Sequence, residues 1–267
     1  MKVLIRGAGD IASGIALRLH RAGMQVVMTD LPAPTAIRRT VCFSQAILLG
    51  EMTVEDVTAR RADSVEEAES LLRRGLIPVL ADPDCACRAQ LRPDALVDAI
   101  LAKRNLGTKI DDAPVVVGIG PGFTAGEDCH AVVETMRGHT LGRVIYRGSA
   151  LPNTNIPGLI GGYAGERVLR ALADGIFCQR LEIGAVVRAG DIAGEVDGEL
   201  MKCTIDGVLR GILADGTPVF KGMKSGDVDP RCKPEYCTTA SDKALAVGGG
   251  VLEAVLNLSG TPRSSCL

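Results

Sequence analysis

Aromatic residues are scarce in this sequence, and tryptophan is absent. The 267 residues include only four Phe and three Tyr. Proteins that bind single-stranded nucleic acids stack the bases on aromatic side chains, so we do not expect that activity. An excess of one charge is also missing, because 30 Lys and Arg face 32 Asp and Glu and leave a net charge of −2. Without a basic surface, neither nucleic acid nor anionic lipid is an expected partner.

Long hydrophobic runs are missing as well. No apolar run approaches the ~18 residues that a membrane-spanning helix requires, and the run at residues 3–5 is too short for a signal peptide. We therefore expect a cytoplasmic protein that does not contact a membrane. Hydrophobic residues make up 46% of the chain, which is typical of a folded protein. The nine cysteines are expected to be thiols in a reducing compartment.

The first thirty residues predict a βαβ unit. A short apolar strand at residues 2–6 precedes a glycine-containing turn, and an amphipathic pattern from Ile11 to His20 predicts a helix. Gly23 follows as a candidate C-cap. A second strand at residues 25–29 ends at Asp30. Two consecutive parallel strands need such a helix as their crossover.

The turn of this unit carries the dinucleotide fingerprint Gly7-x-Gly9-x-x-Ala12. In such turns the glycines allow a tight bend and a close approach of the backbone to a pyrophosphate. The start of the helix, at Asp10 and Ile11, offers free amides to the phosphates, and Asp30 stands where an acid binds a ribose hydroxyl. The alternative is a Rossmann-like fold that binds no nucleotide or a different one, and the charge of Asp10 is unfavourable for phosphates.

The remainder predicts an α/β chain with a Rossmann-like parallel sheet over residues 1–180 and a smaller β-rich, barrel-sandwich-like module over residues 181–230. Short strands separated by Gly-Asp and Asp-Gly turns are the basis for the second prediction. Residues 231–267 are expected to form a loop and a closing helix that packs on the α/β region. Within that region we expect strands at 46–49, 52–57, 77–81 and 115–119, a helix at 64–74 capped by Ser64 and Glu67, and a helix at 131–136.

A second glycine-rich turn contains Gly120 and Gly122. It predicts either an anion cradle or only a tight connection between a strand and a helix. Polar residues follow it, and on the expected helix His130 and Glu134 share one face. This arrangement suggests a metal or proton-transfer site, or alternatively a surface ion pair, and we assign no metal. Cys129 would lie at the helix N-terminus, where a thiolate is favoured.

Two cysteines, Cys85 and Cys87, are separated by one residue. Such a pair can hold a soft metal or chalcogen, or act as attacking and resolving thiols. The alternative is a loop that carries two unrelated thiols. An unstrained disulfide between them is not expected at this spacing.

Four segments resemble the YqeB-type accessory proteins of selenium-dependent molybdenum hydroxylases, with a shorter similarity to XdhC-type maturation factors around residues 248–253. The segments are AILAKRNLGT, GIGPGFTAGEDCHAVVETMRGHTLGRVIYRGSALPNT, GDVDPR and SDKALAVGGGVLEAVL. The resemblance implies a role in cofactor maturation, with a selenium-dependent molybdenum hydroxylase and its maturation proteins as partners. The cofactor would be a dinucleotide, either molybdopterin cytosine dinucleotide or NAD(P).

Joined to this resemblance, the residue patterns give a set of candidate site residues. A thiolate can carry selenium as a perselenide, and the candidates are Cys85, Cys87 and Cys129. The residues expected to line the site are Glu134, Arg137, His139, Asn153 and Thr154. Two alternatives stay open: an NAD(P)-dependent oxidoreductase, and a non-catalytic chaperone that docks the hydroxylase through the β module. The sequence leaves open whether the chain is an enzyme, and its glycine-rich, aliphatic character is compatible with a homodimer.

Overall fold

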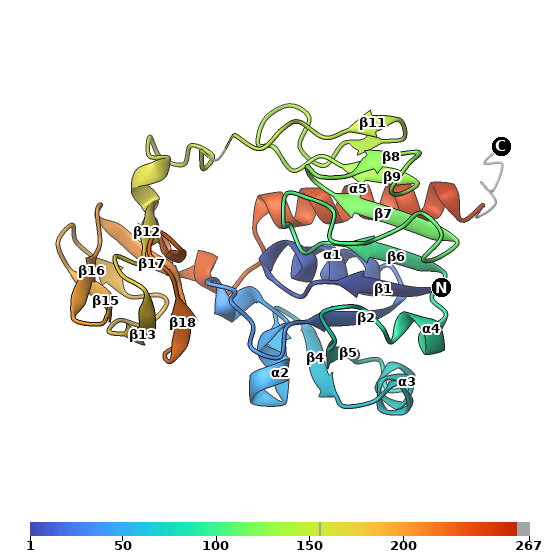
Figure 1. Ribbon diagram of the computed structural model, residues 1–267, viewed down its shortest axis with the longest axis horizontal. Helices are drawn as coiled ribbons and strands as arrows, with labels where there is room; N and C mark the ends of the chain where they lie inside the picture. Colours follow the sequence, from blue (N-terminus) through green and yellow to red (C-terminus); the bar gives the residue numbers. More distant parts are fainter. Residues whose placement is uncertain (155, 261–267) are drawn as a thin grey trace.

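The computed structural model describes residues 1–154 and 156–260. Two parts lie side by side in Figure 1: a large sheet flanked by helices, and a pair of small sheets built from residues 168–229. The α/β class predicted from the sequence is confirmed. No helix in the described residues is long and apolar enough to cross a bilayer.

The first part contains a nine-stranded mixed sheet. Its strand order is β10-β9-β7-β6-β1-β2-β5-β4-β3. Its elements, with two flanking strands and a short 3-10 turn, are β1 (Lys2–Arg6), α1 (Asp10–Arg21), β2 (Gln25–Asp30), η1 (Arg39–Val41), α2 (Gln45–Leu49), β3 (Glu51–Val54), β4 (Val57–Ala62), α3 (Val65–Arg73), β5 (Ile77–Ala81), α4 (Arg88–Leu91), β6 (Ala95–Asp98), β7 (Val115–Ile119), β8 (Thr124–Ala125), β9 (Ala131–Val133), β10 (Val144–Ile145), β11 (Gly148–Ser149) and α5 (Asp242–Leu258).

The centre of this sheet is parallel. β1 pairs in parallel with both β2 and β6, and only the outermost pairs, β3–β4 and β9–β10, are antiparallel. The chain therefore builds outward from β1 on one side and returns to its other side at β6. In open α/β sheets, ligands bind at such a switch point, outside the carboxyl ends of the strands.

Helices cover both faces of the sheet. One core cluster packs α1, α2 and α5 against the first face, and a second packs α3, α4 and the loop thiols against the other. Because both faces are buried, the central strands are apolar almost throughout, as in Val115–Ile119.

α1 and α5 lie unusually close together, and glycines allow this. A Cβ at Gly14 would lie 2.5 Å from the Cβ of Ala244, and a Cβ at Gly248 would lie 2.8 Å from the carbonyl oxygen of Gly14. The glycine run 248–250 therefore lies inside α5, the closing helix expected from the sequence. The helices run together from their N-terminal ends (Figure 1).

The second part consists of two antiparallel four-stranded sheets with an apolar core between them. The sheet orders are β12-β19-β17-β14 and β16-β15-β13-β18. The strands are β12 (Val168–Arg170), β13 (Gly175–Gln179), β14 (Val186–Val187), β15 (Ile192–Val196), β16 (Glu199–Lys202), β17 (Gly207–Ile212), β18 (Thr217–Val219) and β19 (Lys224–Asp229), flanked by the short helices η2 (Gly165–Arg167) and η3 (Pro234–Cys237).

The helix caps predicted from the sequence are present in the structure. The Ser64 hydroxyl accepts the Glu67 amide at the start of α3, and the Glu67 carboxylate accepts the amide of Asp63. Gly23 has φ +84, and the next amide, that of Met24, reaches back to the carbonyl of Leu19. This is the expected glycine C-cap.

Two apolar segments were assigned to the wrong element. Residues 131–136 do not form a helix, because Ala131–Val133 is strand β9, paired in parallel with β7. Residues 46–49 belong to α2 rather than to a strand. Short apolar runs cannot be divided between buried strand and buried helix by periodicity alone. Residues 261–267 of the predicted C-terminal segment lie outside the described residues.

Adjacent glycines of α5 make a matched test of this packing. A Cβ at Gly250 would lie 2.2 Å from the carbonyl oxygen of Gly142, whereas at Gly249 nothing lies within 4 Å. We expect Gly250→Ala to lower the free energy of unfolding by about 2 kcal/mol or more through overpacking. Gly249→Ala should raise it by about 0.5–1 kcal/mol through better helix propensity. Urea unfolding measures both, and equal effects would contradict the described contact.

Candidate functional site

The loop between β1 and α1 has the geometry that its glycines predict. Gly7 has φ +104, and a Cβ there would lie 2.9 Å from the carbonyl oxygen of Ala99, just beyond β6. Gly9 is the N-cap of α1, and nothing lies within 4 Å of its Cβ position. Ala12 is buried. The backbone at Gly9 is therefore open to an approaching ligand, and the first amides of α1 have no intrahelical acceptor.

A cavity of about 590 Å³ opens at this loop, and we call it the sheet-edge cavity. It lies at the carboxyl ends of β1, β2 and β6, at the switch point of the sheet. All six fingerprint residues named from the sequence line it: Gly7, Gly9, Asp10, Ile11, Ala12 and Asp30.

Asp30 joins the end of β2 to the glycine loop. One carboxylate oxygen accepts the amide of Ala8 and the other accepts the amide of Leu31, both at 2.7 Å. Burial raises the pKa of Asp30, and the two amide hydrogen bonds partly offset this effect. Each carboxylate oxygen has a second lone pair, so Asp30 can still accept a hydrogen bond from a ligand hydroxyl.

Arg6 forms a buried wall of the sheet-edge cavity. Its guanidinium donates to the carbonyl of Pro83, which follows β5, and to the hydroxyl of Thr108 at 3.1 Å. Thr108 in turn donates to the carboxylate of Asp98 at 2.6 Å. The last residue of β1 thus fixes the loops that follow β5 and β6.

A second cavity, of about 680 Å³, adjoins the first, and we call it the cationic cavity. Gly9, Asp10, Ile11 and Ala36 line both cavities, so the start of α1 stands between them. Its other lining residues include five cationic side chains, Arg38, Arg137, Arg167, Lys224 and Lys243. Besides Gly9, Asp10 and Ile11, three further predicted residues line this cavity: Arg137, Asn153 and Thr154.

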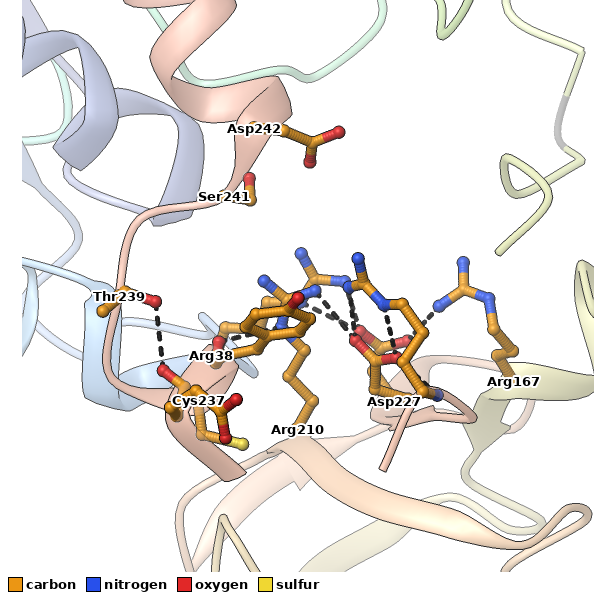
Figure 2. A network of polar contacts seen from close by, with 12 residues as sticks. Arg38, Arg167, Arg210, Asp227, Cys237, Thr239, Ser241 and Asp242 are labelled. Carbon is orange, nitrogen blue, oxygen red and sulfur yellow. Dashed lines mark hydrogen bonds and ion pairs between the residues drawn. The ribbon is translucent and has the colours of Figure 1, made fainter. Parts of the chain in front are cut away.

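Arg38 connects the two parts of the molecule at this cavity. Its Nη1 donates to the carboxylate of Asp10 at 2.9 Å, and its Nε donates to the carboxylate of Asp227 on β19, also at 2.9 Å. Arg167 donates to the other oxygen of Asp227 at 2.9 Å. Figure 2 shows these guanidinium groups gathered around Asp227, with Ser241 and Asp242 at the nearby start of α5.

Electrostatic coupling holds this cluster in its charged form. Burial would raise the pKa of Asp227, but Arg38, Lys224 and Arg167 outweigh that effect and lower it. Burial would likewise lower the pKa of Arg38, but Asp227 and Asp10 reverse the direction. The start of α1 is therefore tied to β19 by a buried ion pair.

Seven other predicted residues line neither cavity: Cys85, Cys87, Gly120, Gly122, Cys129, Glu134 and His139. A Cβ at Gly120 would lie 2.7 Å from the Thr135 hydroxyl oxygen, and one at Gly122 would lie 2.6 Å from the Arg104 Cα, so close packing requires both glycines. Glu134 is buried and accepts the amides of residues 135, 136 and 151. His139 is exposed.

Cys129 is not at a helix N-terminus, because the expected helix is strand β9. It is fully buried, and burial raises the pKa of its thiol to about 11. His130 accepts the amide of Val116 through its Nδ1 at 3.0 Å, so the expected pairing of His130 and Glu134 on one helix face is wrong. Within residues 1–154 and 156–260, no group of three His, Cys, Asp or Glu side chains could hold a metal ion.

Cys85 and Cys87 lie in the loop after β5. Cys85 lines a small cavity of about 220 Å³ together with Arg6 and Asp84, and both of these residues also line the sheet-edge cavity. A hydrogen bond from Cys87 lowers the pKa of Cys85, and the Arg6 guanidinium also lowers it, while the same hydrogen bond and burial raise the pKa of Cys87. Cys85 has φ +56, a sparsely populated conformation for a non-glycine residue.

Several residues of the cationic cavity carry no signal in the sequence. Arg38, Lys224 and Lys243 belong to no motif that predicts a ligand. They come from the loop after β2, from β19 and from α5, and only the docking of the two parts brings them to one cavity. Lys243 alone lay in a segment that carried the family resemblance.

Thiol reactivity tests the pairing of Cys85 with Cys87. Cys87→Ala removes the S–H donor, so the Cys85 pKa should rise and alkylation by iodoacetamide at fixed pH should slow by about tenfold for each unit of the rise. Cys87→Ser keeps a donor and should slow it less. Peptide mass spectrometry follows each site, with the exposed Cys232 as internal control. Equal Cys85 labelling in all three proteins would contradict the hydrogen bond.

Unfolding experiments test the Arg38 ion pair. Arg38→Gln leaves Asp227 buried with one cation fewer, so the free energy of unfolding should fall by about 3 kcal/mol. Arg180→Gln, which breaks an exposed pair with Glu195, should change it little. Because the Asp227 pKa is lowered, the pair stabilises fully above the ordinary carboxyl pKa, and the deficit of the variant should shrink as the pH falls through the lowered value. A deficit that is independent of pH would contradict this coupling.

Comparisons with solved structures give only distant resemblances. An aspartoacylase family protein from Mesorhizobium loti aligns over 76% of this chain and 83% of its own, with 12% identity and a TM-score of 0.26. The ectoine utilization protein EutE (DoeB) from Ruegeria pomeroyi aligns over 85% of both chains, with 12% identity and a TM-score of 0.26. Scores this low do not define a shared fold. No protein-family model matches the chain.

A sequence relative is much nearer. The chain is 54% identical over 256 residues to a protein of Escherichia coli (strain K12) described as "Uncharacterized protein YqeB". The match covers 96% of this chain and 47% of the E. coli protein, so the chain spans about half the length of that relative. The chain is therefore similar to about half of that E. coli protein.

Proposed function

We propose that this chain is an accessory or maturation protein for a selenium-dependent molybdenum hydroxylase, and that it binds a dinucleotide across the two adjoining cavities. The main support is the position of Gly9 and the N-terminus of α1 at the junction of the two cavities. A pyrophosphate bound there would place one half of the dinucleotide in each cavity. The similarity to YqeB and the hydroxylase-accessory segments support the biological role.

The strand order also favours dinucleotide binding. Six of the seven parallel strands, β5-β2-β1-β6-β7-β9, match the order 3-2-1-4-5-6 of Rossmann folds when the edge strand β4 is set aside, and the glycine turn follows the first strand. We therefore propose a Rossmann-like binding domain, extended by the hairpin β3–β4 at one edge and by the antiparallel strand β10 at the other.

The chain's own groups suit each part of such a ligand. The amides at the start of α1 would hold the pyrophosphate, and Asp30 would accept a hydrogen bond from a ribose hydroxyl. Molybdopterin cytosine dinucleotide and NAD(P) both contain these parts. An NAD(P)-dependent oxidoreductase is therefore the second candidate, and Asp30 at the end of β2 is the observation that favours it.

Cys85 is the best placed thiol for a chalcogen carrier, because it lies beside the sheet-edge cavity and its pKa is lowered. The transfer would take the outer selenium or sulfur of a perselenide or persulfide donor. The Cys85 thiolate attacks that atom, its bond to the donor sulfur breaks, and the donor leaves as a thiolate. No net oxidation occurs, and the chain then carries a perselenide or persulfide on Cys85.

Calorimetric titration tests the dinucleotide proposal. We expect binding of molybdopterin cytosine dinucleotide, and Gly9→Val should weaken it at least about tenfold by filling the space at the pyrophosphate. Because nothing lies within 4 Å of the Gly9 Cβ position, the variant should fold with an unchanged urea midpoint. Gly249→Ala, on the exposed side of α5, is the control and should bind normally.

Three outcomes are decisive. Binding of NADH together with substrate turnover would favour the oxidoreductase. Failure of every dinucleotide to bind would overturn the proposal. Equal binding by wild type and Gly9→Val would place any ligand elsewhere.

A further inference from the structure

We propose that the cationic cavity is a subsite for an oxyanion, and that the second half of the bound dinucleotide therefore carries negative charge. This inference rests on the proposed function and deepens it by naming the chemical class of ligand in the second cavity. It separates the two candidate cofactors on physical grounds.

The first support is two lysines that have no ion-pair partner. The arginines that line the cavity are each paired: Arg38 with Asp10 and Asp227, Arg167 with Asp227, and Arg137 with Asp242 through two hydrogen bonds of 2.7 and 2.8 Å. The side chains of Lys224 and Lys243 line the same cavity, and neither makes a direct hydrogen bond or ion pair with a described residue, although the charge of Asp227 acts on Lys224 and that of Asp10 acts on both. Both ammonium groups are therefore left for a ligand.

The second support is the convergence of two helix N-termini. α1 and α5 pack in parallel, so both begin at this cavity: Asp10 and Ile11 line it from α1, and Ser241 and Lys243 line it from α5. The Ser241 hydroxyl caps only the amide of Ala244. Each N-terminus carries a partial positive charge, and the two charges add to those of the lysines.

A third support is a buried polar atom of Arg167. The side chain is almost completely buried and lines the cavity, and its Nε has no hydrogen-bond partner among the described residues. A buried donor without an acceptor destabilises the protein. An oxyanion in the cavity would reduce this cost, because it brings hydrogen-bond acceptors and negative charge close to the Arg167 guanidinium.

These charges disfavour nicotinamide as the occupant. The oxidised nicotinamide ring is a cation, and the ammonium groups of Lys224 and Lys243 would repel it. A phosphate, or a metal–dithiolene group with oxo ligands, is an anion of the kind that lysine binds as a point charge. The charges of the cavity thus favour a molybdopterin-type second half over oxidised NAD(P).

The lysine pKa values give the subsite a pH dependence. Burial lowers the pKa of Lys224, where Asp227 and Asp10 oppose Arg38 and Arg167. Burial and Arg137 lower the pKa of Lys243, where Asp10 and Glu134 oppose this effect and Arg38 adds to it. An anion stabilises the protonated lysines, so binding takes up protons at alkaline pH. Affinity should fall as the pH rises through the lowered lysine pKa values.

Calorimetry with inorganic pyrophosphate tests the subsite without depending on any base. We expect binding to wild type, at least about tenfold weaker binding to the Lys224→Gln/Lys243→Gln double variant, and proton uptake that the double variant loses. Lys202→Gln, an exposed lysine on β16 that lines neither cavity, is the matched control. Identical pyrophosphate affinity in wild type and the double variant would overturn the inference.

A ligand series separates this inference from the proposed function. ADP-ribose 1″-phosphate, ADP-ribose and NAD⁺ share the ADP half, while their second halves are anionic, neutral and cationic. We expect affinity to fall in that order in wild type, with the differences reduced in the double variant. Equal affinities for the three ligands would contradict the oxyanion subsite but would leave the proposal of dinucleotide binding intact. The opposite outcome is that pyrophosphate binds in a lysine-dependent way while no dinucleotide binds. That result would contradict the proposed function but would support the oxyanion site.

Discussion

The guanidinium of Arg38 is the constraint on which the rest of the site depends. It lies between Asp10, at the first turn of α1, and Asp227, on β19 of the antiparallel part. A buried charge is tolerated only when it is paired and hydrogen-bonded, so the two parts must meet at one position to satisfy all three groups. That position forms the second cavity and places it directly beside the glycine loop.

The contact between α1 and α5 has a complementary effect. Glycines replace side chains where the two helices approach, so their backbones can lie close together and in parallel. Parallel packing puts both N-termini, and not one N-terminus and one C-terminus, at the same end of the sheet. The positive ends of two helices are thereby directed at one cavity, which an antiparallel pair would not achieve.

The pKa values of the three thiols named from the sequence differ because of what surrounds each thiol in the fold, and not because of its neighbours in the chain. Cys129 is enclosed among apolar side chains, and its thiol stays protonated. Cys85 is also buried, but it has a thiol donor and a nearby guanidinium, and these favour its thiolate. Burial alone disfavours a charged sulfur, whereas burial with donors can favour it.

The sequence by itself determined the elements whose signals are local. The fingerprint turn, the Ser64 cap and the Gly23 cap depend on residues a few positions apart, and the backbone satisfies them wherever the segment lies in the fold. The α/β class and the six fingerprint residues that line the sheet-edge cavity were predicted from such signals. Tertiary structure decided the rest. Residues 131–133 pair as a strand because β7 offers a free edge, and Gly120 and Gly122 serve close packing. Lys224 and Lys243 meet only because a buried ion pair docks two parts of the chain, and no local pattern encodes a contact between residues so far apart in sequence.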